Sequence, residues 1–375
     1  MSILERSAVA SSTPDEGTPL EARSDDDVVA PRRRLRVTTL DHRLELGGAM
    51  LSSLALVGVI YGHLLPWSGV LGFLVLWYLV FMVLFGLIVS ATSPRPIVVE
   101  RLVTATLTIA SLVVIAALAS AVIFTFAKGW QALGHWNFWT KDMAGVSPSA
   151  PLSHGGVFHA IVGTLIEITL AIIISLPLGL VTAIYMAEVG GRLASLVRTV
   201  VEAMTALPEI LAGLFVYVVL VVGFGFPKSG FAVAVAMSVT MIPIIARTSE
   251  VALRIVPSGL REASGALGGS EWRTTLKVVL PTARAGLATA LILSIARGIG
   301  ETAIPLLVSG ASSFMNVNPF SNPMNSLPLF VYDSYVTHEP IAIERGFGAA
   351  SILLIMVLAL FVVLRLLTRD KKEAR

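Results

Sequence analysis

Two opposite charges stand four residues apart in a long apolar stretch, within "IARGIGETAIPLL" from Ile295 to Leu307. The first of them, Arg297, falls near the middle of the apolar run Ala283 to Val308. In a membrane helix that rises about 1.5 Å per residue, Arg297 lies roughly 16 Å from both Gly286 and Val308, near the bilayer centre. An unpaired arginine at that depth costs about 2.5 to 3.5 kcal/mol on insertion scales. Arg297 is therefore expected to face protein or a water-filled path, and it is a functional candidate.

The chemistry that fits this pair is oxyanion binding. The planar guanidinium of Arg297 offers two parallel donors to phosphate or sulfate. An ionised Glu301 can only accept hydrogen bonds, so it repels sulfate and accepts the proton that hydrogenphosphate still carries. Alternatively, the two side chains lie one helical turn apart and neutralise each other as a structural pair. Gly298 and Gly300 loosen the helix around the two charges, which favours the transport role. The transport role and the structural pair are compatible if Arg297 and Glu301 are paired at rest and an anion separates them.

A third charge, Glu209, lies in the apolar segment Thr199 to Val222. Within a bilayer this carboxyl can pair with Arg297 or be protonated and buried, and the sequence leaves both open. Glu167 can also line a path, although a hydrogen bond between helices explains it more simply. The residues predicted to line a substrate path are Arg297, Glu301, Thr302, Gly300 and Glu209.

The composition places these charges in a bilayer. Only 14% of the 375 residues are charged and 55% are hydrophobic, against roughly 25% charged in an average soluble chain. No cysteine occurs, and the six histidines show no metal-ligand spacing. There is no Gly-x-x-x-x-Gly-Lys-Ser/Thr loop either, so the chain is expected neither to hydrolyse ATP itself nor to bind a cofactor.

We predict an all-α polytopic membrane protein. A helix needs about 20 apolar residues to cross a hydrocarbon core about 30 Å thick. Eight segments meet this requirement: Leu46 to Leu65, Val70 to Ala91, Leu102 to Ala127, Val157 to Val189, Thr199 to Val222, Phe231 to Ile245, Ala283 to Val308 and Phe347 to Leu367. Most of the 27 Lys and Arg residues fall at the two ends and in alternate loops, which predicts that both termini are cytoplasmic.

The longest internal cytoplasmic segment lies between the sixth and seventh spans. A short helix is predicted there, capped by Ser258 and ended by Gly268 and Gly269. Its apolar stripe consists of Leu260, Ala263 and Leu267, with Arg261 and Glu262 beside it. A second amphipathic segment, capped by Ser270, follows. Such a rigid knob suits a groove on a partner protein, and it equally suits lying flat on lipid.

The loop sequence "EASGALGGSEWRTTLKVVLP" resembles the coupling-loop motif of ABC importer permeases. Glu262, Ala263, Gly268, Leu280 and Pro281 fall on that pattern, and Ser264 stands where a second alanine is usual. The resemblance implies that the loop docks on a cytoplasmic ATPase. The residues it assigns to ATPase coupling are Glu262, Ala263, Gly268, Leu267 and Arg261.

The stretch "RGIGETAIPLL" resembles phosphate-specific ABC permeases, and "NPFSNPMNSLPLFVYDSY" resembles the outer loop of their A-type subunit. The similarity runs from about Leu102 to the carboxyl terminus. It implies that Arg297 and Glu301 take part in phosphate passage. It also implies a permease subunit in the bacterial inner membrane, with a sister permease, two ATPase subunits that use ATP, and an extracytoplasmic phosphate-binding protein.

The sequence departs from that family at several positions. Gly298 replaces an alanine, and Ile304 is inserted after Ala303, so nothing is transferred beyond Ala303. Glu209 stands where a small neutral residue is expected. The first two spans exceed the six-span core. The predicted organisation is a basic disordered tail at 1–45, an extra hairpin at 46–91, the permease core at 102–367 with the coupling loop at 246–282, and a tail at 368–375.

Other functions are weaker readings of the same residues. A permease for sulfate or molybdate shares the oxyanion chemistry. A secondary anion transporter or channel works without an ATPase and usually shows paired broken helices in two inverted halves, of which the sequence gives no sign. Nothing indicates a nucleic-acid partner; the expected surroundings are lipid and the other transport subunits.

Overall fold

The structure is a computed structural model that describes residues 40–64 and 69–368. The predicted tails at 1–45 and 368–375 therefore lie outside the described residues except at their inner edges. Every regular element in the described part is helical, as predicted. The chain divides into two compact units, Met1–Val113 and Val114–Arg375, which are described in turn.

The first unit holds two apolar helices and the start of a third. Helix α1 (Leu40–Val59) continues as one π-helical turn, η1 (Ile60–Leu64), and is followed by α2 (Val70–Thr92) and by α3 (Arg95–Leu133), which runs on into the second unit. The two predicted spans of this unit are found in place, at Leu44–His63 and Val70–Thr92. Phe81, Phe85 and Val89 of α2 pack with Ala49 of α1, and Glu45 pairs with Arg101 of α3.

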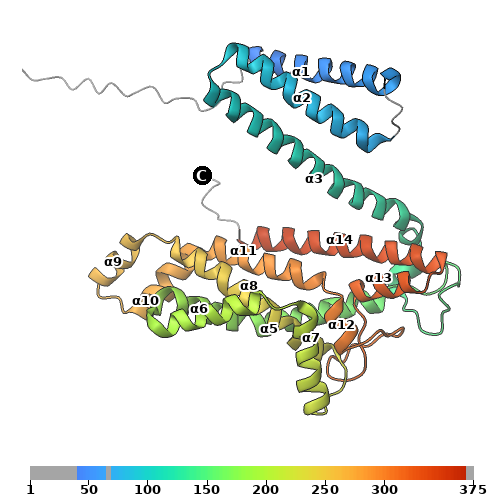
Figure 1. The fold of residues 1–375 in the computed structure, drawn as a ribbon. Coiled ribbons are helices and arrows are strands. Elements are labelled where there is room, and N and C mark those ends of the chain that lie inside the picture. The colour runs from blue at the N-terminus through green and yellow to red at the C-terminus, as the bar shows by residue number, and fades with distance from the viewer. Residues whose placement is uncertain (1–39, 65–68, 369–375) are drawn as a thin grey trace, which may run out of the picture. The chain divides into compact units, whose positions relative to one another are not determined.

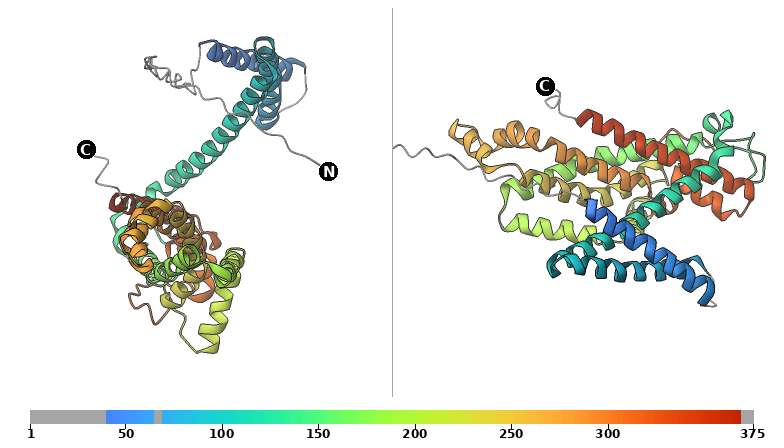
Figure 2. Two further views of the ribbon diagram at one scale, coloured as in Figure 1. Left: turned by 90° about the vertical axis from the view of Figure 1, so that its left-hand side faces the viewer. Right: turned by 90° about the horizontal axis from the view of Figure 1, so that it is seen from above.

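The second unit is a bundle of four long helices, α5 (Phe158–Ile184), α8 (Gly230–Arg254), α11 (Leu280–Ile299) and α14 (Pro340–Thr368), seen side by side in Figure 1 and from the end in Figure 2. Helix α5 continues as the π-helical turn η2 (Tyr185–Val189). The core lies between α5, α8 and α11, where Ile168, Met237, Ile295 and Ile299 are buried. Small residues allow this packing, because a Cβ on Gly298 would lie only 3.0 Å from the Cδ1 atom of Ile168. The glycine at 298 therefore has a packing reason.

The fifth predicted span, Thr199 to Val222, is found as a bent pair of helices and not as one straight helix. Helix α6 (Gly191–Thr205) and helix α7 (Glu209–Val216) meet at an angle of 102°. Pro208 explains the break, because proline fixes its own φ angle and disfavours helix at the preceding residue. Helix α7 continues as the π-helical stretch η3 (Tyr217–Gly223), and Figure 1 shows it turning away from the four long helices.

The seventh predicted span is also interrupted. Helix α11 ends at Ile299, Gly300 is its C-cap, and α12 (Ala303–Val308) begins after a break of three residues. Pro305 has no N–H to give to the carbonyl of Glu301, and glycine weakens a helix, so a continuous helix is disfavoured here. Within the described residues, seven helices are long and apolar enough to span a membrane, or eight if the bent pair α6 and α7 is counted as one span.

The remaining helices lie at the two ends of the second unit. Helix α9 (Ser258–Ala266), helix α10 (Glu271–Thr274) and the π-helical turn η4 (Thr275–Val279) form one end, and α4 (Trp136–Thr140) and α13 (Leu327–Val336) lie toward the other (Figures 1 and 2). The predicted α9 is confirmed in position, and Gly268 adopts a φ of 79° beyond its end. Its predicted cap is wrong: Pro257 is the N-cap and Ser258 the first helical residue.

Candidate substrate path and coupling surface

The two helix breaks lie against each other. Gly213 of α7 faces Ile304 of α12, because a Cβ on Gly213 would lie 3.3 Å from the Cγ1 atom of Ile304. Ile304 is fully buried, in the same core cluster as Val216 and Val308. Ile304 therefore fills the contact between the two short helices, and the breaks before α7 and before α12 come together.

Arg297 and Glu209 form an ion pair at this point, through the Nη2 atom of the arginine and the Oε1 atom of the carboxylate. Of the two alternatives that the sequence left open for Glu209, the structure shows the pair. Arg297 lies in the last turn of α11 and Glu209 is the first residue of α7. A helix carries partial negative charge at its C-terminus and partial positive charge at its N-terminus, so each helix end stabilises the charge that it bears.

The ion pair is accessible. The side chain of Arg297 is 55% exposed and that of Glu209 is 31% exposed on the surface of this chain. A guanidinium in direct contact with hydrocarbon is unfavourable, so this surface requires protein or water beside it. An exposed pair of this kind can exchange its partner without unpacking the bundle.

Glu301 and its neighbours are arranged differently from the prediction. The Oε1 atom of Glu301 accepts a hydrogen bond from the backbone N–H of Ala303 at 3.0 Å. Among the described residues no ion pair joins it to Arg297, so the alternative of a structural pair one helical turn apart is not found, because α11 ends at Ile299. Gly300 is exposed, and Thr302 borders an apolar cavity of ≈ 590 Å³ between α12, α13 and α14. Arg297 and Glu209 are thus in contact, and Gly300 and Glu301 follow Arg297 closely along the chain. Thr302 borders the pocket between α12, α13 and α14 instead.

Sequence reasoning missed a group of charges near the C-terminal end of α8. The side chain of Glu250 is only 3% exposed, and it pairs with Arg198 of α6 at 2.7 Å and with Arg254 at 2.8 Å. Arg247 contacts Glu250 at 3.4 Å and Glu202 of α6 at 2.9 Å. The signal was present in the sequence, since Arg247, Glu250 and Arg254 recur on one face of a helix. These pairs attach α6 to α8.

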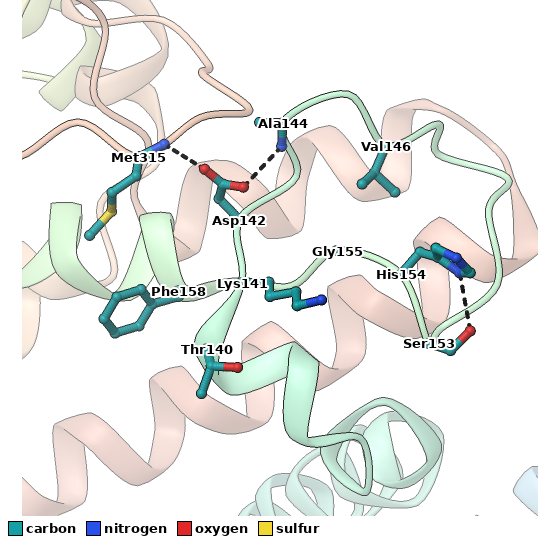
Figure 3. A pocket seen from close by; sticks show the side chains of 10 residues that line it. All are labelled: Thr140, Lys141, Asp142, Ala144, Val146, Ser153, His154, Gly155, Phe158 and Met315. Carbon is teal, nitrogen blue, oxygen red and sulfur yellow. Dashed lines mark hydrogen bonds between the residues drawn. The ribbon is translucent and has the colours of Figure 1, made fainter.

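A buried arginine was also missed. Arg345 of α14 is 1% exposed, and its two terminal nitrogens donate to the backbone carbonyls of Pro148, Ala150, Pro151 and His154 at 2.8 to 3.1 Å. This side chain holds the loop between α4 and α5 against the bundle. The loop encloses a pocket of ≈ 500 Å³, drawn in Figure 3, where Asp142 accepts hydrogen bonds from the N–H groups of Ala144 and Met315.

Glu167 of α5 is 2% exposed, and its Oε1 atom has no hydrogen-bond partner in the described part of the chain. The hydrogen bond between helices that the sequence favoured is therefore not made by that atom.

The residues predicted to couple to an ATPase lie on α9 and just beyond it. Glu262, Ala263, Leu267 and Gly268 are exposed, and the side chain of Leu267 is 89% exposed. No residue of α9 is buried. Arg261 is the exception to this outward arrangement, because its guanidinium contacts Glu188 of η2 at 2.9 Å.

Comparison with known proteins identifies the class. Residues 175–370 match the family described as "Binding-protein-dependent transport system inner membrane component", and this covers more than half of the chain. The chain therefore belongs to that family: it is a multi-pass inner-membrane component of a transport system and not an enzyme.

Individual relatives are similar over 62% to 69% of the chain. The chain is 40% identical over 232 residues to "Phosphate transport system permease protein PstA 1" of Mycobacterium tuberculosis (strain CDC 1551 / Oshkosh), covering 62% of this chain and 76% of the relative. It is 33% identical over 271 residues to PstA of Yersinia pestis, covering 69% and 90%. A solved structure of the MetNI methionine ABC transporter in an inward-facing conformation aligns at 23% identity with a TM-score of 0.45, covering 57% of this chain and 93% of that chain.

Proposed function

We propose that this chain is a permease subunit of an ATP-driven phosphate importer, and that phosphate passes beside Arg297. The family consists of binding-protein-dependent transport components, and the relatives at 33 to 40% identity are named as phosphate transport permeases. Sulfate and molybdate share the oxyanion chemistry, but no relative described above carries such a name.

One observation supports the path more than any other: a half-exposed arginine stands at the meeting point of two helix breaks and is held by a single described carboxylate. Placing a cation within the apolar part of a membrane span costs about 2.5 to 3.5 kcal/mol. A charged residue at such a position is therefore expected to have a function. The guanidinium fork matches the geometry of a phosphate group, which two parallel N–H donors bind.

The chemistry of passage then follows from the neighbouring residues. Phosphate approaching Arg297 competes with the carboxylate of Glu209 for the same donors. Glu301 uses Oε1 to hold the N–H of Ala303. Its other oxygen can accept the proton of hydrogenphosphate, which sulfate lacks. Gly300 and Thr302 complete the turn that exposes backbone beside the anion. In this proposal the chain contributes binding and selection, and ATP is used by a partner.

The partners follow from the surfaces. A sister permease chain covers the exposed Arg297 and Glu209 and encloses the path between the two chains. Two ATPase subunits act on the cytoplasmic side, where the exposed Leu260, Glu262, Ala263 and Leu267 form the docking face of α9. A binding protein delivers phosphate to the opposite end of the bundle. The charge distribution favours this orientation, with the α9 loop inside.

The test is ATP-dependent uptake by the assembled complex in liposomes. Phosphate, sulfate and molybdate are supplied separately with the binding protein. We expect phosphate uptake by the natural complex, its loss in Arg297→Ala, and normal uptake in Arg95→Ala, which removes an exposed arginine from the first unit. Uptake of sulfate or molybdate in preference to phosphate would reassign the substrate. Full phosphate uptake by Arg297→Ala would remove Arg297 from the path.

A further inference from the structure

Arg261 of α9 makes more directed contacts than any other residue of that helix. Its Nη2 and Nε atoms donate to the two carboxylate oxygens of Glu188 at 2.9 and 3.3 Å. This is the two-pronged arginine-carboxylate geometry, which is among the stronger charged contacts in proteins. Glu188 belongs to η2, the direct continuation of α5.

The same guanidinium also holds the end of α8. Its Nη1 atom donates to the carbonyl of Val256 at 2.7 Å, and Nη2 donates to the carbonyl of Leu253 at 2.9 Å. Leu253 lies in the last turn of α8 and Val256 just beyond it, where the carbonyls carry the partial negative charge of the helix end. A cation placed there is stabilised by that charge, so Arg261 joins α9 to the ends of α5 and α8 together.

These contacts end on a packed junction. Leu253 and Val256 are buried with Ala183 of α5, Val279 of η4 and Ala283 of α11. The guanidinium itself is partly shielded, since the side chains of Arg261 and Glu188 are 28% and 16% exposed. Arg261 therefore reaches the point where three of the four long helices meet.

Without this side chain, α9 is held loosely. It lies between Pro257, which is its N-cap, and Gly268, whose φ is 79°, so the chain leaves the helical conformation on both sides. None of its residues is buried. Its other described side-chain contact of note joins Ser264 to Thr274 of α10 at 2.7 Å, within the same loop. A rod between two non-helical joints moves independently of the bundle unless side chains connect them.

We infer that Arg261 is a positioning residue that transmits displacement of α9 to α5 and α8, and that it does so inside the permease instead of by contact with the ATPase. The inference rests on the proposed function. The route onward is continuous: α8 packs on α5 and α11, and α11 carries Arg297 in its last turn. Movement of the docked α9 thus reaches the helix breaks as a rigid displacement. Glu188 is the partner without which the two-pronged contact fails.

The experiment separates coupling from docking. The complete complex with its binding protein is reconstituted in liposomes, and phosphate uptake and ATP hydrolysis are measured on the same vesicles. For Arg261→Met we expect the ATPase to remain bound and active, while phosphate taken up per ATP hydrolysed falls about tenfold. Glu188→Gln should give the same loss, and the double variant should be no worse than either single one, because the two residues act as one contact.

Three controls decide between explanations. Arg273→Met removes an exposed arginine of the same loop and should leave the uptake per ATP unchanged. The exchange of charges in Arg261→Glu with Glu188→Arg should recover part of the loss. Thermal unfolding of each purified complex reports whether a variant merely loosens the fold.

Dissociation of the ATPase from Arg261→Met would overturn the inference, because it would make Arg261 a docking residue. Losses that add in the double variant, or a Glu188→Gln complex with natural uptake per ATP, would overturn it too. Failure of the proposed function looks different: the natural complex then takes up no phosphate, whatever its ATP hydrolysis.

Discussion

Removing the charge of Glu209 should make the proposed site bind phosphate more tightly. In the structure this carboxylate occupies the guanidinium that an incoming oxyanion needs, so Glu209 acts as an internal competitor. The substitution Glu209→Gln keeps the size and the polar character of the side chain. It removes the ion pair and leaves Arg297 available to an anion from solution.

The size of the effect follows from the exposure of the pair. Two unit charges about 4 Å apart attract by about 4 kcal/mol at an effective dielectric constant of about 20. Exposed pairs measure about 0.2 to 1 kcal/mol, because water screens the charges, whereas breaking desolvated pairs costs about 3 to 5 kcal/mol. The side chains are 55% and 31% exposed, which lies between these cases. We take about 1.5 kcal/mol, which corresponds to about tenfold in the dissociation constant.

The assay is equilibrium binding of radiolabelled phosphate to the purified complex without its binding protein, so that only the permease site is measured. We expect the dissociation constant of Glu209→Gln to be about tenfold lower than that of the natural complex. Glu209→Asp keeps the charge and should stay near the natural value. Glu202→Gln is the matched control, since it removes a carboxylate of the same charge from the neighbouring helix α6.

Unchanged or weaker phosphate binding by Glu209→Gln would refute the competition argument. An equal gain in Glu202→Gln would refute it as well, because the effect would then come from net charge and not from the pair. Transport need not follow affinity. A tighter site releases phosphate more slowly, so we expect uptake by Glu209→Gln to fall when release limits the cycle.

Three further predictions concern the frame around the path. Arg345→Met leaves the carbonyls of the loop between α4 and α5 without their donor. Because hydrogen bonds to a charged group contribute about 1.5 to 3 kcal/mol, we expect the midpoint of thermal unfolding to fall by several degrees. Arg345→Lys should not restore it, because lysine lacks the planar fork of donors. Glu250→Gln leaves three arginines beside a neutral group and should destabilise the complex by about 3 kcal/mol, measured by the same unfolding assay. Burial raises the pKa of Asp333 in α13 from its ordinary value of 3.8 to about 6. The folded state then binds the proton of Asp333 more tightly than the unfolded state, so the contribution of this group to stability is greatest below pH 3.8 and is lost as pH rises to about 6. Asp333→Asn should remove this dependence of the unfolding temperature on pH and should unfold at a higher temperature than the natural complex at pH 8. An unchanged pH dependence would contradict the assignment.

The spans were predictable because one physical quantity, the length of an apolar run, sets them. A stretch of about 20 apolar residues has one stable state in a bilayer, so the helices were found with errors mainly at their ends. The short helix α9 was predictable for a similar reason, since a Pro before it and a Gly after it mark both of its limits.

The helix breaks were not predictable from the same signals. Pro177 and Pro243 lie inside the unbroken helices α5 and α8, whereas Pro208 and Pro305 lie at the breaks. A proline costs a helix the same hydrogen bond in each case, and neighbouring helices decide whether the segment stays straight. The partner of Arg297 depends on this outcome: a continuous helix points to Glu301, and a broken one leaves the guanidinium to Glu209.

The position of Arg297 at the end of a helix bears on how the path can release its cargo. The C-terminus of α11 carries partial negative charge, which stabilises the cation and repels an anion bound to it. An arginine at a helix N-terminus would instead reinforce the hold of that terminus on phosphate. A conducting path needs sites that an ion enters readily and leaves readily, and strong retention defeats it. The helix end and the competing carboxylate of Glu209 act in the same direction: both weaken the grip of the guanidinium on phosphate once ATP-driven movement opens the path. In the proposed function, the break after α11 therefore contributes to transport by limiting affinity, which a continuous helix carrying the same arginine would not do.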